Sequence, residues 1–257
     1  MHDTHFHFSD KLREYFPIKG IANAASPGEY ELLDSLKNEG GFLVSAGIHP
    51  WYADRYDFSD FRKYLEKADF VGEIGLDSVW CETPADIQLD RFIRQLQFAS
   101  DIHKPVILHT KGMEKEIADI IKDYPNTYLV HWYSAEEYLD DYISLGCYFS
   151  VGPSVGMDEA VNNVVRKAPA DRLLLETDGL NAVAWAFDCD ESEVDYRKTF
   201  ERSVQQISLL REEVPRFDDN ASYGSVGSGR QSSFALWEKK LDENFAAFCK
   251  NAASVKG

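Results

Sequence analysis

The stretch Asp3-Thr4-His5-Phe6-His7, close to the start of the chain, places two histidines two residues apart in a run that favours a β-strand. Successive side chains of a strand point to opposite faces, so His5 and His7 project in the same direction. Two imidazoles side by side on one strand can hold one metal ion. Histidines more often pack in the core or stay solvated, so these two alone do not indicate a metal site. The evidence for one has to come from other residues of the chain.

Eight short, mostly apolar runs predict β-strands, and most are followed by a helical pattern. The strand candidates are Asp3–Phe8, Gly20–Ala25, Phe42–His49, Phe70–Leu76, Pro105–His109, Tyr128–Tyr133, Cys147–Val151 and Leu173–Glu176. The helical patterns are Ser26–Gly40, Phe58–Lys67, Thr83–Ala99, Ile117–Ile121, Glu136–Leu145, Asp158–Lys167, Asp195–Glu213 and Phe234–Lys250. Only the short segment Ser9–Pro17 follows the first strand, which predicts an abbreviated first unit.

Alternation of buried strands with helices predicts an α/β fold with a parallel sheet. Eight units close most naturally into a single (β/α)8 TIM-type barrel with extra C-terminal helices, one domain over residues 1–257. An open doubly wound sheet is the alternative, but it would bring a glycine-rich phosphate loop, which this sequence lacks. Residues 215–233 are rich in Asp, Asn, Gly and Ser, and they predict a mobile loop.

The composition, 44% hydrophobic and 28% charged over 257 residues, fits a globular protein with a sizeable core. A net charge of −17 disfavours broad nonspecific nucleic-acid binding. It leaves room for a metal-centred phosphate site, because a bound cation dominates its own surroundings. We expect neither a leader peptide nor a membrane span, since the chain enters the first strand at once and no apolar run approaches about 20 residues. Four widely separated cysteines favour reduced thiols and a cytoplasmic location.

Histidines and carboxylates recur near the ends of the predicted strands. The set comprises His5, His7, Glu73, His109, His131 and Asp178. In a barrel the C-terminal strand ends meet on one face, where catalytic residues lie. A glutamate inside the apolar run around Glu73 is costly to bury unless it is paired or bound to metal. A hydrogen-bonded core residue explains any one of these, but a metal site explains the six together better.

Imidazole and carboxylate ligands suit Zn²⁺ or Mn²⁺, and carboxylates also admit Mg²⁺. Six ligands exceed the three or four of a single catalytic zinc. The set therefore predicts two divalent ions that share a carboxylate.

The order of the motifs resembles the TatD family of metal-dependent hydrolases, within the amidohydrolase-like barrels. The matching stretches are Asp3-Thr4-His5-Phe6-His7, Gly47-Ile48-His49-Pro50, Gly72-Glu73-Ile74-Gly75-Leu76-Asp77, the segment from Gln95-Leu96 to His109-Thr110, His131, and Leu175-Glu176-Thr177-Asp178. The resemblance implies that the first two histidines and Asp178 hold one ion. It further implies that Glu73 bridges two ions and that His109 and His131 complete the second site.

The chain departs from the family pattern on the substrate side. Lys111 stands where the family has an arginine, which turns a bidentate phosphate clamp into a point charge. Gly179-Leu180 replaces the usual Ser-Pro, and Trp132-Tyr133-Ser134-Ala135 occupies a place where a small residue and a glycine are usual. None of these departures touches an expected metal ligand.

Three residues just past strand ends are candidates for binding substrate: His49, Asp77 and Lys111. The alternative for His49 is a hydrogen bond that orients another group of the site. The alternative for Asp77 is a cap on a helix or loop.

The resemblance implies phosphodiester hydrolysis by a metal-dependent deoxyribonuclease that trims DNA ends in the 3′–5′ direction. Asp178 is then the general base, and Glu73 is the second catalytic residue. One alternative is an amidase, lactonase or phosphotriesterase-like hydrolase of a small molecule, with Trp132, Tyr133 and Trp185 forming an apolar pocket wall. Another is a non-catalytic metal-binding scaffold.

Overall fold

The computed structural model describes residues 1–212 and 229–253, with side chains for residues 1–212 and 233–250. Its centre is a parallel sheet of eight strands that are ordered in the sheet as they are in the chain. The strands are β1 (Asp3–Phe6), β2 (Gly20–Ala24), β3 (Leu43–Ala46), β4 (Phe70–Asp77), β5 (Val106–Lys111), β6 (Tyr128–Val130), β7 (Tyr148–Val151) and β8 (Leu173–Leu175).

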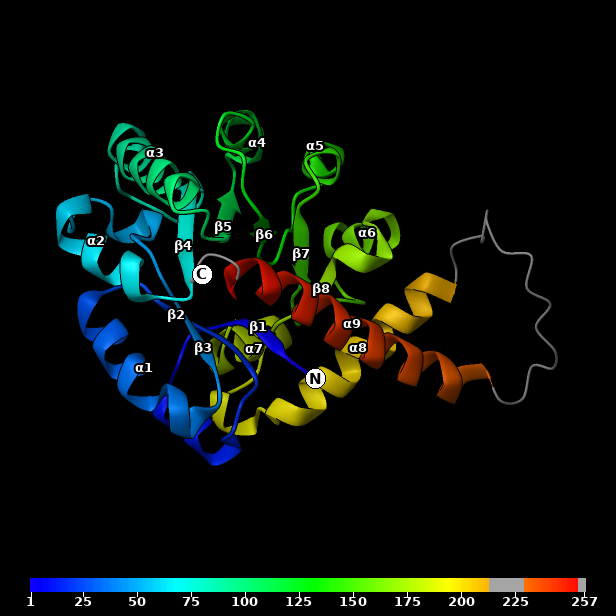
Figure 1. The fold of residues 1–257 in the computed structure, drawn as a ribbon. Coiled ribbons are helices and arrows are strands. Elements are labelled where there is room, and N and C mark those ends of the chain that lie inside the picture. The colour runs from blue at the N-terminus through cyan, green and yellow to red at the C-terminus, as the bar shows by residue number, and fades with distance from the viewer. Residues whose placement is uncertain (213–228, 254–257) are drawn as a thin grey trace.

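The outer strands β1 and β8 come together and nearly close the sheet into a barrel (Figure 1). The Thr4 hydroxyl donates a hydrogen bond to the Leu175 carbonyl at 2.9 Å, and the Asp178 N–H donates to the His5 carbonyl at 3.0 Å. The predicted (β/α)8 barrel is confirmed, and the open doubly wound alternative is wrong.

Helices surround the barrel on its outer side (Figure 1). They are α1 (Pro27–Gly40), α2 (Phe58–Lys67), α3 (Ala85–Asp101), α4 (Glu114–Ile121), α5 (Leu139–Ser144), α6 (Glu159–Lys167) and α8 (Tyr196–Glu212). After β1 there is only the 3-10 helix η1 (Asp10–Tyr15), so the abbreviated first unit is confirmed. Shorter 3-10 turns are η2 (Pro50–Tyr52), η3 (Ala170–Arg172) and η4 (Glu191–Glu193).

Two C-terminal helices differ from what the sequence predicts. The helix α7 (Leu180–Phe187) was not expected, because its residues are apolar nearly throughout and show no helical alternation with polar ones. The helix α9 (Gly229–Ala253) begins before the predicted Phe234. The predicted loop 215–233 is therefore wrong for residues 229–233, where a hydrogen bond between the Ser208 and Ser233 hydroxyls (2.6 Å) docks α9 on α8. The rest of that loop lies outside the described residues.

The inward side chains change from apolar to polar along the strands. Successive inward pairs are Ile21 and Asn23, Leu43 and Ser45, Ile107 and His109, Leu129 and His131, Tyr148 and Ser150, and Leu174 and Glu176. The helix α9 lies across the N-terminal end of the barrel (Figure 1), where its Phe248 stacks on Phe70 with ring centroids 5.3 Å apart. Apolar packing thus fills one end, and polar groups gather at the other.

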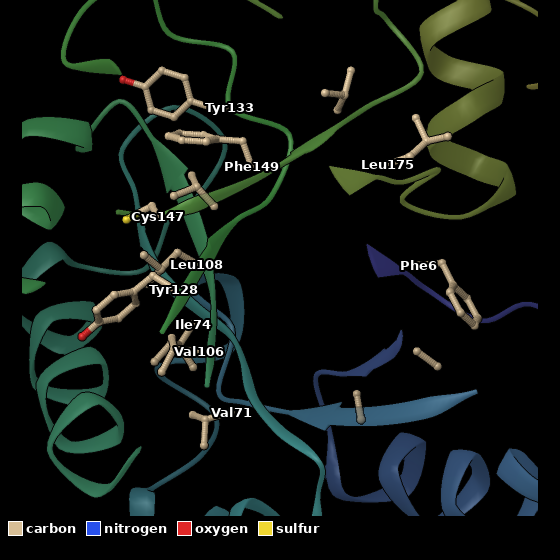
Figure 2. Close-up of a cluster of buried hydrophobic side chains, with 14 of the residues drawn as sticks. Phe6, Val71, Ile74, Val106, Leu108, Tyr128, Tyr133, Cys147, Phe149 and Leu175 are labelled. Carbon is tan, nitrogen blue, oxygen red and sulfur yellow. The ribbon is translucent and has the colours of Figure 1, made fainter. Parts of the chain in front are cut away.

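The apolar side chains on the outer faces of the strands pack against the helices. Figure 2 shows this layer, including Phe6, Val71, Leu108, Phe149 and Leu175. Within the described ranges we find no helix with the length and apolar character that a bilayer crossing requires.

Candidate metal centre

Glu73 points into the barrel because β4 carries an extra residue. Val71 pairs with Val106 and Ile74 pairs with Leu108, so three steps along β4 match two steps along β5. Val71 and Ile74 therefore both face the helices, which strict alternation would forbid. The irregularity reverses the alternation and leaves Glu73 on the inner side, 3% exposed.

The two carboxylate oxygens of Glu73 face different histidines. Its Oε2 lies 3.4 Å from Nε2 of His5 and 3.3 Å from Nε2 of His7. Its Oε1 lies 2.7 Å from Nδ1 of His109 and 2.8 Å from Nε2 of His131. The structure therefore brings all four histidines of the predicted ligand set to one carboxylate.

Asp178 completes the side occupied by the first two histidines. Its Oδ1 lies 3.3 Å from Nε2 of His5 and 3.6 Å from Nε2 of His7. The turn that carries Asp178 is anchored by Asp3, whose carboxylate accepts hydrogen bonds from the backbone N–H of Thr177 (2.9 Å) and its hydroxyl (2.6 Å). The His7 side chain is 42% exposed, so this side of the cluster opens to solvent.

Two further carboxylates lie behind the histidines on the other side. Nε2 of His109 lies 3.0 Å from Oδ2 of Asp77, and Nδ1 of His131 lies 3.4 Å from Oε1 of Glu176. A carboxylate on the far nitrogen fixes the orientation of a metal-binding imidazole. Sequence reasoning overlooked Glu176 as a separate site residue. The sequence could have indicated Glu176, because it is a charged residue at the end of the apolar run Leu173–Glu176. The same kind of pattern identified Glu73.

His49 also reaches the cluster, but its ring nitrogens are arranged differently. The Trp51 backbone N–H donates to Nδ1 of His49 at 3.1 Å, so the proton of the neutral ring lies on Nε2. That Nε2 points at Oε1 of Glu73, 3.4 Å away. Burial lowers the pKa of His49 to about 4, which keeps the ring neutral. His49 thus presents an N–H donor to the site.

The residue before His49, Ile48, is held by the buried amide of Gln95. The Ile48 backbone N–H donates to Oε1 of Gln95 at 2.6 Å, and Nε2 of Gln95 donates to the Ile48 carbonyl at 3.2 Å.

Opposite charges outweigh burial for His5, Glu73 and Asp178. Burial and the neighbouring His131 lower the pKa of His5, but Glu73 and Asp178 together raise it to about 9. Burial opposes ionisation of Glu73, yet the surrounding imidazoles hold its pKa well below the usual range. The pKa of Asp178 is also lowered despite burial, because the rings of His5, His131 and His7 lie close to its carboxylate. Divalent cations can replace the protons that balance these carboxylates.

The donor set fits a metal ion. Among the described residues, both ring nitrogens of His5 and Oδ1 of Asp178 are buried without a hydrogen-bond partner. Each such atom costs about 1–3 kcal/mol, so a group of them indicates a ligand. Three overlapping sets in the described part of the chain have their ligand atoms within 4.8 Å of one another: His5, Glu73 and His131; His5, His7 and Asp178; and His49, Glu73 and His109. The N–H on Nε2 argues against His49 as a ligand.

The other residues expected at the substrate side lie in different surroundings. The Asp77 carboxylate is buried and accepts hydrogen bonds from the Trp51 ring N–H (2.8 Å) and from the backbone N–H groups of Val79 and Trp80 (both 2.8 Å). Lys111 lies at the rim, where its ammonium donates to the Ser134 hydroxyl at 2.9 Å.

Tyr133 does not line the site. It is 1% exposed and packs beside Phe149, with ring centroids 6.3 Å apart (Figure 2). The expectation that Tyr133 forms a pocket wall together with Trp132 and Trp185 is therefore wrong for Tyr133. Tyr133 points to the layer between strands and helices, because it lies just beyond the end of β6, where the side-chain direction no longer follows strand alternation.

A barrel with imidazoles and carboxylates gathered at the C-terminal strand ends has the architecture of metal-dependent hydrolases. The chain belongs to the TatD family, since the family model described as TatD related DNase matches residues 3–213. The family resemblance predicted from the motifs is confirmed.

The relatives agree with this membership. YabD of Bacillus subtilis, described as an uncharacterized metal-dependent hydrolase, is 29% identical over 171 residues, 64% of this chain and 65% of YabD. The chain thus spans slightly less than two thirds of that relative. The 3′-5′ ssDNA/RNA exonuclease TatD of Rahnella sp. (strain Y9602) is 29% identical over 196 residues, 69% of this chain and 74% of that protein.

The crystal structure of YjjV, a TatD homologue from Escherichia coli, superposes with a TM-score of 0.72 at 22% sequence identity. The match covers 93% of this chain and 96% of YjjV. At this identity the likeness establishes the barrel fold.

Proposed function

We propose that this protein is a metal-dependent hydrolase that cleaves phosphodiester bonds at DNA ends, a 3′–5′ exodeoxyribonuclease of the TatD type. One observation carries the proposal: Oε2 of Glu73 faces His5 and His7, whereas Oε1 faces His109 and His131. A carboxylate with its oxygens divided in this way suits a bridge between two divalent ions, Zn²⁺, Mn²⁺ or Mg²⁺. The relatives named as hydrolases and as an ssDNA/RNA exonuclease support the reaction class.

In this proposal, His5, His7 and Asp178 would hold one ion, His109 and His131 would hold the other, and Glu73 would serve both. When bound, such ions lower the pKa of a water molecule towards about 7 and stabilise negative charge on the phosphoryl group.

The remaining chemistry belongs to side chains of this chain. Asp178, ionised at neutral pH, accepts the proton of the attacking water and passes it to the leaving oxygen. The N–H on Nε2 of His49 donates to a phosphoryl oxygen, and the Lys111 ammonium provides positive charge at the rim. Asp77 acts through His109 by holding Nε2 of that ring.

The substitution Asp178→Asn tests the proposal, because it keeps the shape of the side chain and removes its basicity. We expect the reconstituted wild type to shorten a 5′-labelled single-stranded oligonucleotide progressively. The variant should be slower by about 10²–10⁴-fold while it retains metal. Gel analysis of the products, with metal content by mass spectrometry, provides the measurement.

Other outcomes point to other functions. Near-wild-type cleavage by Asp178→Asn with metal retained places the base elsewhere. If DNA is left intact while an ester, lactone or phosphotriester is turned over, and Glu73→Ala abolishes that turnover, the protein is a small-molecule hydrolase. Absence of any turnover favours a metal-binding scaffold.

The cytoplasmic location stays a prediction. It rests on the wide spacing of the four cysteines, and all four are free thiols in the structure.

A further inference from the structure

Three tryptophans from three separate segments of the chain meet at the mouth of the barrel. They are Trp80 after β4, Trp132 after β6 and Trp185 on α7, and we call them the tryptophan cluster. The Trp185 ring centroid lies 6.3 Å from that of Trp80 and 6.0 Å from that of Trp132, with planes 74° and 72° apart. Trp185 is 68% exposed and Trp80 is 54% exposed, so solvent reaches large apolar surfaces here.

The two outer members of the cluster are held in place. The Trp132 ring N–H donates to the Ser154 hydroxyl at 3.0 Å. The ring also lies against Gly152, where an added Cβ would come within 2.5 Å of it, so only glycine leaves room. Trp80 is anchored through its backbone N–H to Asp77 and lies under the Lys111 ammonium, 4.5 Å from the ring centroid. Trp185 therefore lies exposed between two fixed rings.

Lys111 connects this cluster to the metal centre. It lies on β5 two residues after His109, so both side chains point to the same side of the strand. The Lys111 ammonium thus lies beyond the metal centre towards the mouth, against the Trp80 ring. A group bound on the tryptophans would have a positive charge and the metal centre on its inner side.

We propose that the tryptophan cluster is a stacking site for a nucleobase at a single-stranded nucleic-acid end whose phosphate reaches Lys111 and the metal centre. This inference rests on the proposed function, and it names the part of the substrate that the rim recognises. Aromatic rings stack on any base, whereas the bases of a duplex are already stacked on one another. The cluster therefore favours single strands with little sequence preference.

Charge also favours stacking as the source of affinity. The net charge of −17 repels a polyphosphate chain, so binding through many phosphate contacts is disfavoured. Stacking needs no net positive charge on the protein. We expect binding to depend on the presence of bases and to vary only weakly with salt.

The test compares two short single-stranded probes of equal length on the metal-reconstituted protein. One carries thymine bases and the other is abasic, and both have phosphorothioate linkages that resist hydrolysis. Fluorescence anisotropy should show the base-bearing probe binding about 10-fold or more tightly. The Trp185→Ala variant should lose that preference, and Trp185→Phe should keep most of it.

The control variant Leu236→Ala removes a comparably exposed apolar side chain (64%) on α9, at the other end of the barrel, and should leave the preference unchanged. Equal binding of the two probes by wild type, no binding of either, or an undiminished preference in Trp185→Ala would overturn the stacking site. Cleavage of ordinary oligonucleotides is measured separately. If binding shows a base preference that depends on Trp185 but DNA is not cleaved, the stacking site stands and the nuclease function is rejected. If DNA is cleaved but binding shows no base preference, the nuclease function stands and the stacking site is rejected.

Discussion

At the scale of single residues, the position of one proton separates His49 from the other histidines of the cluster. All five imidazoles lie within 3.4 Å of Glu73. Nδ1 of His49 accepts a backbone hydrogen bond, so its Nε2 carries a proton and cannot offer a lone pair to a metal. Distance alone would have counted it as a ligand.

We therefore expect different metal contents in two variants. Glu73→Gln should lose most of both ions after reconstitution, because the amide is a poor bridge. His49→Ala should keep close to the wild-type content. Mass spectrometry of the dialysed proteins measures the metal-to-protein ratio, with the exposed His103→Ala as a control. A loss in His49→Ala as large as that in Glu73→Gln would contradict this assignment, and so would a wild type without metal.

A second expectation concerns Cys147, which is 1% exposed. Burial raises the pKa of its thiol to about 12, from 9.0. The folded protein keeps this proton where the unfolded chain releases it, so the free energy of unfolding falls as pH rises from about 9 to about 12. One such group contributes a slope of about 1.4 kcal/mol per pH unit. Urea unfolding of Cys147→Ala should show a shallower decline above pH ~9 than wild type. If the free energy of unfolding fell equally steeply with pH in both proteins, a raised pKa of the Cys147 thiol would be contradicted.

At the scale of elements, the close approach of β4 to β5 brings Glu73 beside His109. Gly75 pairs with His109 in the ladder, and an added Cβ at Gly75 would lie 1.9 Å from the His109 carbonyl oxygen. Only a residue without a side chain lets the strands pair at this point. Together with the extra residue after Val71, this contact places the bridging carboxylate.

Gly75→Ala should therefore destabilise the protein by about 2–3 kcal/mol and lower its metal content, because the strands must separate. The matched control is Gly28→Ala on α1, where an added Cβ meets nothing within 4 Å. That change should stabilise by about 0.5–1 kcal/mol through helix propensity. Urea unfolding measures the free energy of unfolding of both variants. If both substitutions changed it in the same direction, the close approach of the strands at Gly75 would not be what requires glycine there.

At the scale of the whole molecule, α9 closes the barrel that the other elements build. Phe248 is fully buried and stacks on Phe70 of β4, while the Asn244 amide donates to the carbonyls of Ala170 and Leu173, both at 2.8 Å. We propose that the barrel and this helix form one domain, as expected for residues 1–257. The helix covers the apolar end of the barrel, opposite the end where the histidines and carboxylates gather.

Phe248→Ala should then lower the stability of the whole barrel by about 3–5 kcal/mol in one cooperative transition. Leu236→Ala, on the exposed side of the same helix, should change it by less than about 0.5 kcal/mol. Guanidinium unfolding followed by circular dichroism and tryptophan fluorescence measures both. A separate early transition of α9, or equal effects of the two variants, would show that the helix is not part of the core.

The sequence by itself determined the barrel and the identities of the clustered side chains. Strand and helix patterns depend only on residues near one another in the sequence. A charged or imidazole group in an apolar run, such as the one around Glu73, is likewise recognisable from the sequence alone. The short first unit was visible for the same reason, because Ser9–Pro17 has too few residues for a crossover helix.

Only the tertiary structure decided how these residues are used. The extra residue in β4 reverses the strand alternation, so the inward direction of Glu73 depends on its pairing with β5. The role of His49 depends on a hydrogen bond within its own turn, and the helix α7 forms without a periodic signal. The tryptophans of the mouth come from positions up to 105 residues apart, 80 to 185, and meet only because the barrel closes. Such contacts depend on packing between distant segments, which no local pattern encodes.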